Sequence, residues 1–199
     1  MPYDSQTHHR RSIRKRGYDY ALPGWYFVTL CTEGKKHAFG CIIEWCMELN
    51  DAGRMVADVW KRLPLRFPTL IVDEFVVMPN HFHAIFQLAG APPSPRSGQA
   101  LVGARGGDNV GAPLVGALRK RAGTSPAPTV GQIVGTYKSL TANQYLQGGR
   151  QSAWLSMPEG LWQRNYYEHI IRNDRELEIT RVYVRENPAR WDTDQENIT

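Results

Sequence analysis

The sequence predicts an α+β protein in which an antiparallel β-sheet packs against helices. Three observations lead to this class. The chain has 199 residues and 42% hydrophobic side chains, which suits one globular domain with a buried core. Short segments rich in β-branched and aromatic residues precede segments whose apolar residues recur at helical spacing. Two of the strand-like segments meet at Pro79-Asn80, a tight turn that predicts antiparallel neighbours.

The first half of the chain is predicted to hold most of the sheet. Its expected strands span residues 24–31, 38–44, 69–78 and 81–88. A helix is expected between the second and third of them. Asn50 can cap it, apolar residues follow at three- and four-residue spacing, and Pro64 can end it.

The second half is predicted to be mainly helical. Helical spacing of apolar residues returns over 130–147, and a mixed segment over 161–172 receives no assignment. The last helix is expected over 173–188. Asn173 can cap this helix, and Glu176 is its capping-box partner. Pro188 predicts that the helix stops at Asn187, because a residue before proline avoids helical geometry.

Two segments differ in composition from the rest of a single domain over 1–199. Residues 1–20 form a basic arm that ends in aromatic residues. Residues 89–130 contain no aromatic residue and are dominated by Pro, Gly, Ala and Ser, which is typical of a flexible, low-complexity insertion. We therefore expect the core to form without either segment.

Charge and composition exclude several classes of protein. The 24 Lys and Arg residues exceed the 19 Asp and Glu residues, and this moderate excess favours an anionic partner such as nucleic acid. No apolar run approaches the ~20 residues of a membrane helix, and no apolar segment follows the basic N-terminus as in a secretory signal. The three cysteines lack metal-knuckle spacing, so we expect reduced thiols and a cytoplasmic protein. No glycine-rich phosphate-binding motif is present.

The basic arm is a candidate DNA-binding element. Positive charge beside aromatic faces suits a phosphate backbone with unstacked bases. Its candidate contacts are Arg10, Arg11, Arg14, Lys15, Arg16, Tyr18 and Tyr20. A solvated tail without a partner is the alternative interpretation. Lys138, in the helix expected over 130–147, is a further candidate phosphate contact, although an exposed helix lysine often has no such role.

A candidate metal site lies in the strand expected over 81–88. Residues two apart in a strand point to the same face, so His81 and His83 project side by side while Phe82 points to the opposite layer. Two imidazoles on one face can share a divalent metal, although each histidine could instead be an ordinary core or surface residue.

The last helix offers a nucleophile and a third ligand. Tyr183 and Asn187 are four residues apart and therefore lie on one face of that helix. The amide oxygen of Asn187 is a hard ligand that suits Mg²⁺ or Mn²⁺. Such a metal could polarise a phosphodiester while a phenol attacks it. Tyr167, beside Glu168 and His169, is kept as a second candidate nucleophile, and no general base for Tyr183 is identified.

Six blocks of sequence together resemble the REP-associated tyrosine transposases, a branch of the single-tyrosine HUH transposases of bacteria. They are Arg10-Arg-Ser-Ile-Arg, Gly17-Tyr-Asp-Tyr, Trp25-Tyr-Phe-Val-Thr, Val77-Met-Pro-Asn-His-Phe-His, Leu161-Trp-Gln-Arg-Asn-Tyr-Tyr-Glu-His-Ile-Ile-Arg-Asn and Tyr183-Val-Arg-Glu-Asn-Pro. HUH denotes a histidine–hydrophobic–histidine strand, here His81-Phe82-His83. The blocks span nearly the whole chain outside the insertion, and their order is more specific than any one of them.

The resemblance implies a fold, an activity and a set of site residues. The fold would be a ferredoxin-like HUH core. The activity would be metal-dependent cleavage and rejoining of single-stranded DNA at REP-type palindromic hairpins, through a 5′-phosphotyrosine intermediate. Tyr183 would be the nucleophile, and His81, His83 and Asn187 would hold Mg²⁺ or Mn²⁺. A monomer rather than a dimer, located at the bacterial nucleoid, would be expected.

Two other functions are compatible with the same residues. One is a hairpin-binding protein without catalysis, which would keep the basic arm and lack turnover. The other is a replication initiator or relaxase of the HUH type, although those enzymes are generally larger than this chain. Retention of both histidines, Tyr183 and Asn187 favours the enzyme.

Overall fold

The structure of the protein, a computed structural model, describes residues 19–90, 128–152, 154–194 and 196–197. The basic arm up to Tyr18 and most of the 89–130 insertion lie outside these residues, so the expectations for both stay untested. No helix in the described ranges has the length and apolar character that a membrane crossing requires.

The described residues form six strands, three α-helices and three 3₁₀ turns. The strands are β1 (Gly24–Cys31), β2 (Gly40–Ile43), β3 (Cys46–Leu49), β4 (Leu70–Val77), β5 (His81–Leu88) and β6 (Tyr167–Ile171). The α-helices are α1 (Asp51–Arg62), α2 (Val130–Ser152) and α3 (Asp174–Glu186). Short 3₁₀ turns form η1 (Glu33–Lys35), η2 (Leu63–Leu65) and η3 (Pro188–Thr193).

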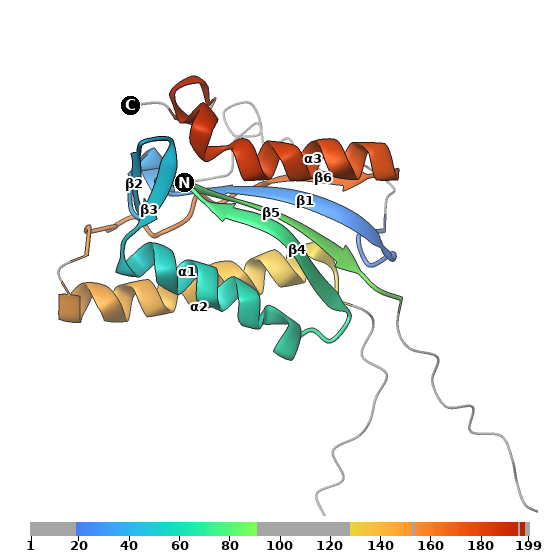
Figure 1. Cartoon of the computed structure of the whole chain (residues 1–199). Helices are drawn as coiled ribbons and strands as arrows, with labels where there is room; N and C mark the ends of the chain where they lie inside the picture. The colour runs from blue at the N-terminus through green and yellow to red at the C-terminus, as the bar shows by residue number, and fades with distance from the viewer. Residues whose placement is uncertain (1–18, 91–127, 153, 195, 198–199) are drawn as a thin grey trace, which may run out of the picture.

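Four strands form one antiparallel sheet in the order β4-β5-β1-β6. Together with α1 and α2 they give the chain order β-α-β-β-α-β, which is the ferredoxin-like arrangement. The predicted fold class is therefore confirmed. The strand β6 lies in the mixed segment over 161–172, to which sequence patterns assign no element. Figure 1 shows α1 and α2 on one side of the sheet and α3 on the other.

The second expected strand, over 38–44, does not join this sheet. Residues 40–43 pair instead with β3 in a separate two-stranded hairpin. Its turn residues Glu44 and Trp45 both have positive φ, at 48° and 65°. Such turns usually contain Asn or Gly, which tolerate this geometry, so the sequence has no signal for the hairpin here.

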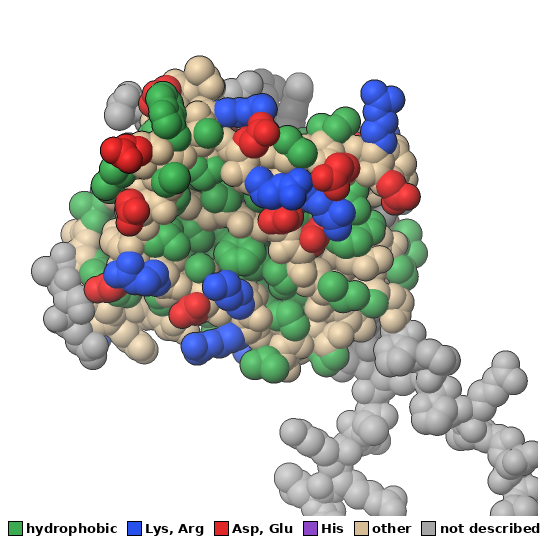
Figure 2. Space-filling model, in the orientation of Figure 1, with side chains coloured by type: hydrophobic (Ala, Val, Ile, Leu, Met, Phe, Trp, Pro, Cys, Tyr) green, Lys and Arg blue, Asp and Glu red, His purple; other side chains and the backbone are tan. Residues whose placement is uncertain are grey.

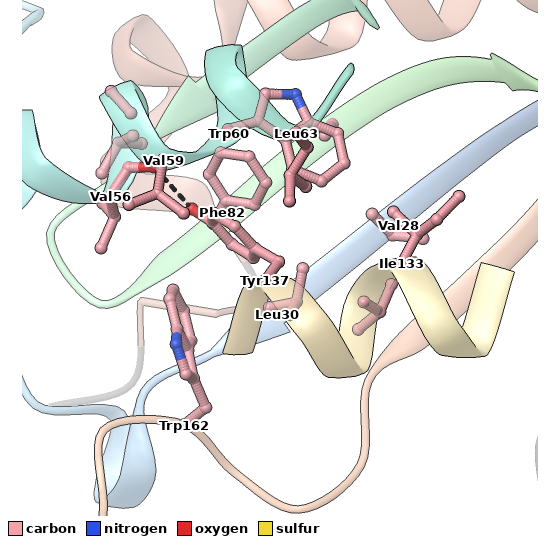
Figure 3. Close-up of a cluster of buried hydrophobic side chains, with 14 of the residues drawn as sticks. Val28, Leu30, Val56, Val59, Trp60, Leu63, Phe82, Ile133, Tyr137 and Trp162 are labelled. Carbon is pink, nitrogen blue, oxygen red and sulfur yellow. Dashed lines mark hydrogen bonds between the residues drawn. The ribbon is translucent and has the colours of Figure 1, made fainter. Parts of the chain in front are cut away.

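The main core lies between the sheet and the pair α1 and α2. Trp60 from α1, Phe82 from β5 and Tyr137 from α2 are fully buried and in mutual ring contact, with centroids 5.0–5.2 Å apart. The Tyr137 hydroxyl donates to the carbonyl oxygen of Val56 at 3.1 Å (Figure 3). This contact satisfies a polar atom that would otherwise be costly to bury.

The opposite face of the sheet has a smaller apolar core beneath α3. It consists of Phe27, Ile85, Ile171, Leu177 and Val184. Successive residues of β5 point to opposite faces, so His81 and His83 share the α3 face while Phe82 enters the main core. The expected separation of Phe82 from the two histidines is thus observed.

Helix α3 begins and ends where the sequence predicts. The Asn173 side chain accepts a hydrogen bond from the backbone N–H of Glu176 at 2.9 Å. The Glu176 carboxylate accepts from the backbone N–H of Arg172 at 2.7 Å, one residue before the usual capping-box position. Asn187 is the C-cap of the helix, and Pro188 opens η3. Asn187 itself has helical φ and ψ, at −55° and −43°, so the expected avoidance of helical geometry before proline is not observed.

Candidate metal and nucleophile site

The two histidines of β5 lie side by side under α3. Their ring centroids are 4.5 Å apart, and both side chains are buried. Pairing of β1 with β5 sets Cys31 opposite His81 and Thr29 opposite His83. Their separation of two residues along β5 places the two rings next to each other on one face of the sheet.

Each imidazole ring has a hydrogen-bond partner at its Nδ1 atom. His81 Nδ1 lies 2.8 Å from Asn80 Oδ1, an oxygen that can only accept. The amide nitrogen of Asn80 donates to the carbonyl oxygen of Glu196, which fixes the orientation of this amide. His81 Nδ1 must therefore hold the proton, and Nε2 keeps a free lone pair. His83 Nδ1 lies 2.8 Å from Thr29 Oγ1, a hydroxyl that can donate or accept, so this contact orients the ring of His83 without fixing its tautomer.

Helix α3 brings the predicted tyrosine to these rings. The Tyr183 hydroxyl lies 3.4 Å from His83 Nε2, and the two rings are 5.3 Å apart at 61°. Asn187 follows one turn later and is 1% exposed. The structure thus brings together the four residues that the sequence placed at the site.

Asp194, which follows η3, is a fifth member that the sequence analysis missed. Its carboxylate accepts a hydrogen bond from Asn187 Nδ2 at 2.9 Å and lies 3.8 Å from His81 Nε2. The ligand atoms of His81, His83 and Asp194 all fall within 4.8 Å of one another, so this group could hold a metal ion. No short motif marks Asp194, because the chain reaches the site only after folding back beyond Pro188.

Two buried polar atoms at the site have no hydrogen-bond partner among the described residues. They are His81 Nε2 and Asn187 Oδ1. Such atoms are rare in folded proteins because burying them without a partner costs free energy. Both have lone pairs, and both are of types that bind divalent metals. The site therefore fits a cation chemically.

Burial also sets the protonation of the site. It lowers the pKa of His81, although the Asp194 carboxylate opposes this shift. It lowers the pKa of His83 well below its ordinary value, and the neighbouring His81 lowers it further. Both rings are thus neutral near pH 7, as metal ligation requires. Burial raises the pKa of the Tyr183 phenol, and the Asp194 carboxylate raises it further.

A cavity of about 590 Å³ opens beside His83 and gives access to Tyr183. Its lining residues are Phe27, Thr29, His83, Tyr167, Tyr183, Asn187, Arg190, Thr193, Asp194 and Glu196. Tyr167, the second candidate nucleophile, therefore opens into the same space as Tyr183. It lies on β6, two strands away from His83.

Of the candidate DNA contacts, the structure describes Tyr20 and Lys138, and neither lines this cavity. Arg10, Arg11, Arg14, Lys15, Arg16 and Tyr18 lie outside the described residues. Tyr20 packs against the main core, with its ring 6.5 Å from that of Tyr26. Lys138 Nζ donates to three backbone carbonyls, those of Gln163, Arg164 and Asn165. The ammonium of Lys138 thus holds the loop before β6.

The surface that carries α1, β4 and the outer side of α3 has no uniform charge. Basic and acidic side chains are interspersed over this face in Figure 2. Some are paired, as in the contact of Arg181 with Asp73 at 2.7 Å and that of Arg185 with Glu178 at 3.1 Å. A polyanion needs a stretch of unpaired positive charge, so this face does not resemble a DNA-binding surface.

Comparison with known proteins gives a relative in sequence and a relative in structure. The chain is 36% identical over 193 residues to an uncharacterized protein of Haemophilus influenzae (strain ATCC 51907 / DSM 11121 / KW20 / Rd), covering 97% of this chain and 96% of that protein. No family model matches. A solved structure of a REP-associated tyrosine transposase bound to a REP hairpin has the same fold, with a TM-score of 0.52 and 15% identity. The match covers 90% of this chain and 74% of the solved one.

Proposed function

The chain belongs to the family of the Haemophilus influenzae protein, and from the geometry of its site we propose that it is a metal-dependent endonuclease and strand transferase for single-stranded DNA. One observation favours this function above others. The Tyr183 hydroxyl lies 3.4 Å from His83 Nε2, at the edge of a buried group of possible metal ligands. A phenol next to a Lewis-acid site is the arrangement that phosphodiester transfer to tyrosine requires.

The residues that would hold the metal are His81, His83 and Asp194, with the amide oxygen of Asn187 beside them. Neutral imidazoles and a carboxylate with an amide oxygen suit Mn²⁺ well and Mg²⁺ acceptably. When bound, the metal would polarise the phosphoryl oxygens and offset charge that develops in the transition state. The orphaned lone pairs of His81 Nε2 and Asn187 Oδ1 support this assignment.

Tyr183 would attack the scissile phosphorus with its phenolic oxygen. A bond forms between this oxygen and phosphorus, the bond from phosphorus to the 3′-oxygen breaks, and the leaving oxygen takes up a proton to become a 3′-hydroxyl. The phenol proton would pass to the carboxylate of Glu196, which lines the same cavity and is not among the residues proposed to hold the metal. Attack of a 3′-hydroxyl on the phosphotyrosine reverses these steps and rejoins a strand without ATP.

The substrate that we propose is a palindromic hairpin with a single-stranded foot. The basic arm, from Arg10 to Arg16, would bind its phosphates, because it places five basic side chains within seven residues and aromatic residues directly after them. The structural relative with the same fold is bound to a REP hairpin, which makes REP-type hairpins the first substrates to test.

The test is a covalent-adduct assay with Tyr183→Phe. Wild-type protein is incubated with a 5′- or 3′-labelled hairpin and Mn²⁺ or Mg²⁺, then separated on a denaturing gel. Wild type should give a shortened strand and a protein–DNA adduct. Tyr183→Phe should bind the hairpin and give neither product. Tyr145→Phe, which removes a hydroxyl that bonds the Leu155 carbonyl in another part of the molecule, should cleave as wild type does.

The metal is tested in the same assay. Excess chelator, or His81→Ala combined with His83→Ala, should abolish cleavage and spare most of the hairpin affinity, because affinity rests on phosphate and base contacts. His169→Ala is the matched control, since this histidine pairs with Glu176 away from the cavity. Adduct formation by Tyr183→Phe, or full cleavage in chelator, would overturn the proposal. Binding without cleavage by wild type under all metals would favour the non-catalytic hairpin-binding protein.

A further inference from the structure

A second aromatic residue lines the cavity beside Tyr183. Tyr167 begins β6, an edge strand of the sheet, and 50% of its surface is exposed. It points into the cavity of about 590 Å³ together with Thr29 and His83. A large aromatic side chain that is half exposed in a site cavity is available to a ligand.

The sheet fixes the distance between Tyr167 and the metal ligands. Tyr167 is the cross-strand partner of Thr29 on β1, and Thr29 is the partner of His83 on β5. The three residues therefore form one row across the sheet on the α3 face. Neighbouring strands are about 4.8 Å apart, so Tyr167 lies roughly 10 Å from His83 along this row. A phosphate at Tyr183 and a base at Tyr167 can belong to adjacent parts of one DNA strand.

Phe27 holds both tyrosines in place. Its ring makes edge contacts with Tyr167 at 6.3 Å and with Tyr183 at 6.0 Å, and it stacks on His83 at 5.4 Å. Phe27 is itself 8% exposed and belongs to the core beneath α3. The edge contact is the only ring contact of Tyr167 within the described residues, and half of the surface of this residue is exposed at the cavity.

We propose that Tyr167 is a stacking platform for an unpaired nucleobase of the strand whose phosphate reacts at Tyr183. The inference rests on the proposed function and adds to it the position of a base beside the scissile bond. Every base has a π-face, so a single aromatic ring can bind it without reading its identity. The role uses the ring of Tyr167 and not its hydroxyl, which distinguishes it from the role of a second nucleophile.

The test separates the ring from the hydroxyl. Tyr167→Ala should weaken binding of a hairpin with a single-stranded foot by about tenfold, a typical loss for one stacked base. Tyr167→Phe should recover most of that loss and still form the adduct. Trp45→Ala is the matched control, because Trp45 is 62% exposed on the β2–β3 hairpin and does not line this cavity. Its hairpin affinity should equal that of wild type.

A second measurement identifies the base. Foot strands with one abasic position each are bound by wild type and by Tyr167→Ala. At the position that stacks on Tyr167, the loss of the base and the loss of the ring should not add, because either change removes the same interaction. At all other positions the two losses should add.

Each outcome decides the inference separately from the proposed function. Equal hairpin affinity of Tyr167→Ala and wild type, or additive losses at every abasic position, would overturn the stacking role while adduct formation at Tyr183 continued. Loss of the adduct in Tyr167→Phe would overturn it as well, because the hydroxyl would then be the essential group. Absence of any adduct in wild type would overturn the proposed nuclease, and the binding data would still decide the stacking role. Thermal unfolding of each variant checks that the fold is retained.

Discussion

Replacing Asn187 by Asp is the sharpest test of the metal site, because it acts on one buried contact. Asn187 Nδ2 donates to Asp194 Oδ2 at 2.9 Å, and the two side chains are 1% and 4% exposed. In Asn187→Asp the donor is removed and a second carboxylate faces Asp194. Without a cation, the site would then contain two like charges in contact.

The expected destabilisation by Asn187→Asp has two contributions. A hydrogen bond to a charged group contributes about 1.5–3 kcal/mol to stability. Repulsion between two unit charges 4 Å apart is about 4 kcal/mol at an effective dielectric constant of about 20, and uptake of a proton by one carboxyl limits it. In chelator, we expect Asn187→Asp to lower the free energy of unfolding by about 4 kcal/mol. This corresponds to a fall in Tm of roughly 8–16 °C for a domain of this size.

A divalent cation should reverse most of this loss. One divalent cation between the two carboxylates would attract both and so offset their mutual repulsion. The rise in Tm on adding Mn²⁺ should therefore be larger for Asn187→Asp than for wild type. Asn187→Leu is the matched control, because it removes the same hydrogen bond without adding charge. Its gain with Mn²⁺ should be no larger than that of wild type.

The assay is thermal unfolding of the three proteins at pH 7, in chelator and in a series of Mn²⁺ concentrations. If Mn²⁺ raised the Tm of Asn187→Asp and of Asn187→Leu by the same amount, a cation between the side chains at positions 187 and 194 would be refuted. An Asn187→Asp variant as stable as wild type in chelator would refute the expected repulsion, because the carboxylates would then be too far apart or too well hydrated to interact.

Three further predictions concern the arm, a helix cap and a loop. Deleting residues 1–16 should weaken hairpin binding and flatten its salt dependence by about 0.7 in log K against log salt for each phosphate that the arm neutralises, measured by binding isotherms at several salt concentrations. Asn173→Ala should lower the free energy of unfolding in urea by about 1 kcal/mol, because it removes the cap of α3; an unchanged midpoint would contradict this. Lys138→Met should lower the free energy of unfolding by about 1–3 kcal/mol, since three carbonyls lose their donor. If Lys138 is instead a phosphate contact, the variant should mainly lower the salt slope of hairpin binding.

The two histidines, the tyrosine and the helix cap could be predicted because local geometry decides them. Alternation along β5 places His81 and His83 on one face, and a four-residue step along α3 places Tyr183 near Asn187. These relations hold for any strand or helix, whatever surrounds it. Periodicity therefore places the members of each pair on one face, whereas the roles expected for these residues came from the resemblance to a known family.

The missed features depend on the tertiary structure. Asp194 reaches His81 only because η3 folds back over the end of β5, where Trp191 stacks on His81 at 5.9 Å. Strand β6 is only five residues long, and it pairs with β1 across more than a hundred residues of sequence. No periodicity within a short window contains such information.

The two faces of strand β5 have different surroundings: one packs in the main core, and the other carries the candidate metal site. Phe82 packs on Trp60 and Tyr137, so the α1 and α2 face holds the large aromatic core. The α3 face has only a small apolar cluster, and the buried polar atoms of His81 and Asn187 beside it have no partner among the described residues. Without a cation, the unpaired polar atoms lower the stability of the folded state. A cation that bound these atoms in the folded state alone would raise its stability again. The central strand can therefore hold an unfavourable polar pair on one face because the other face supplies the packing.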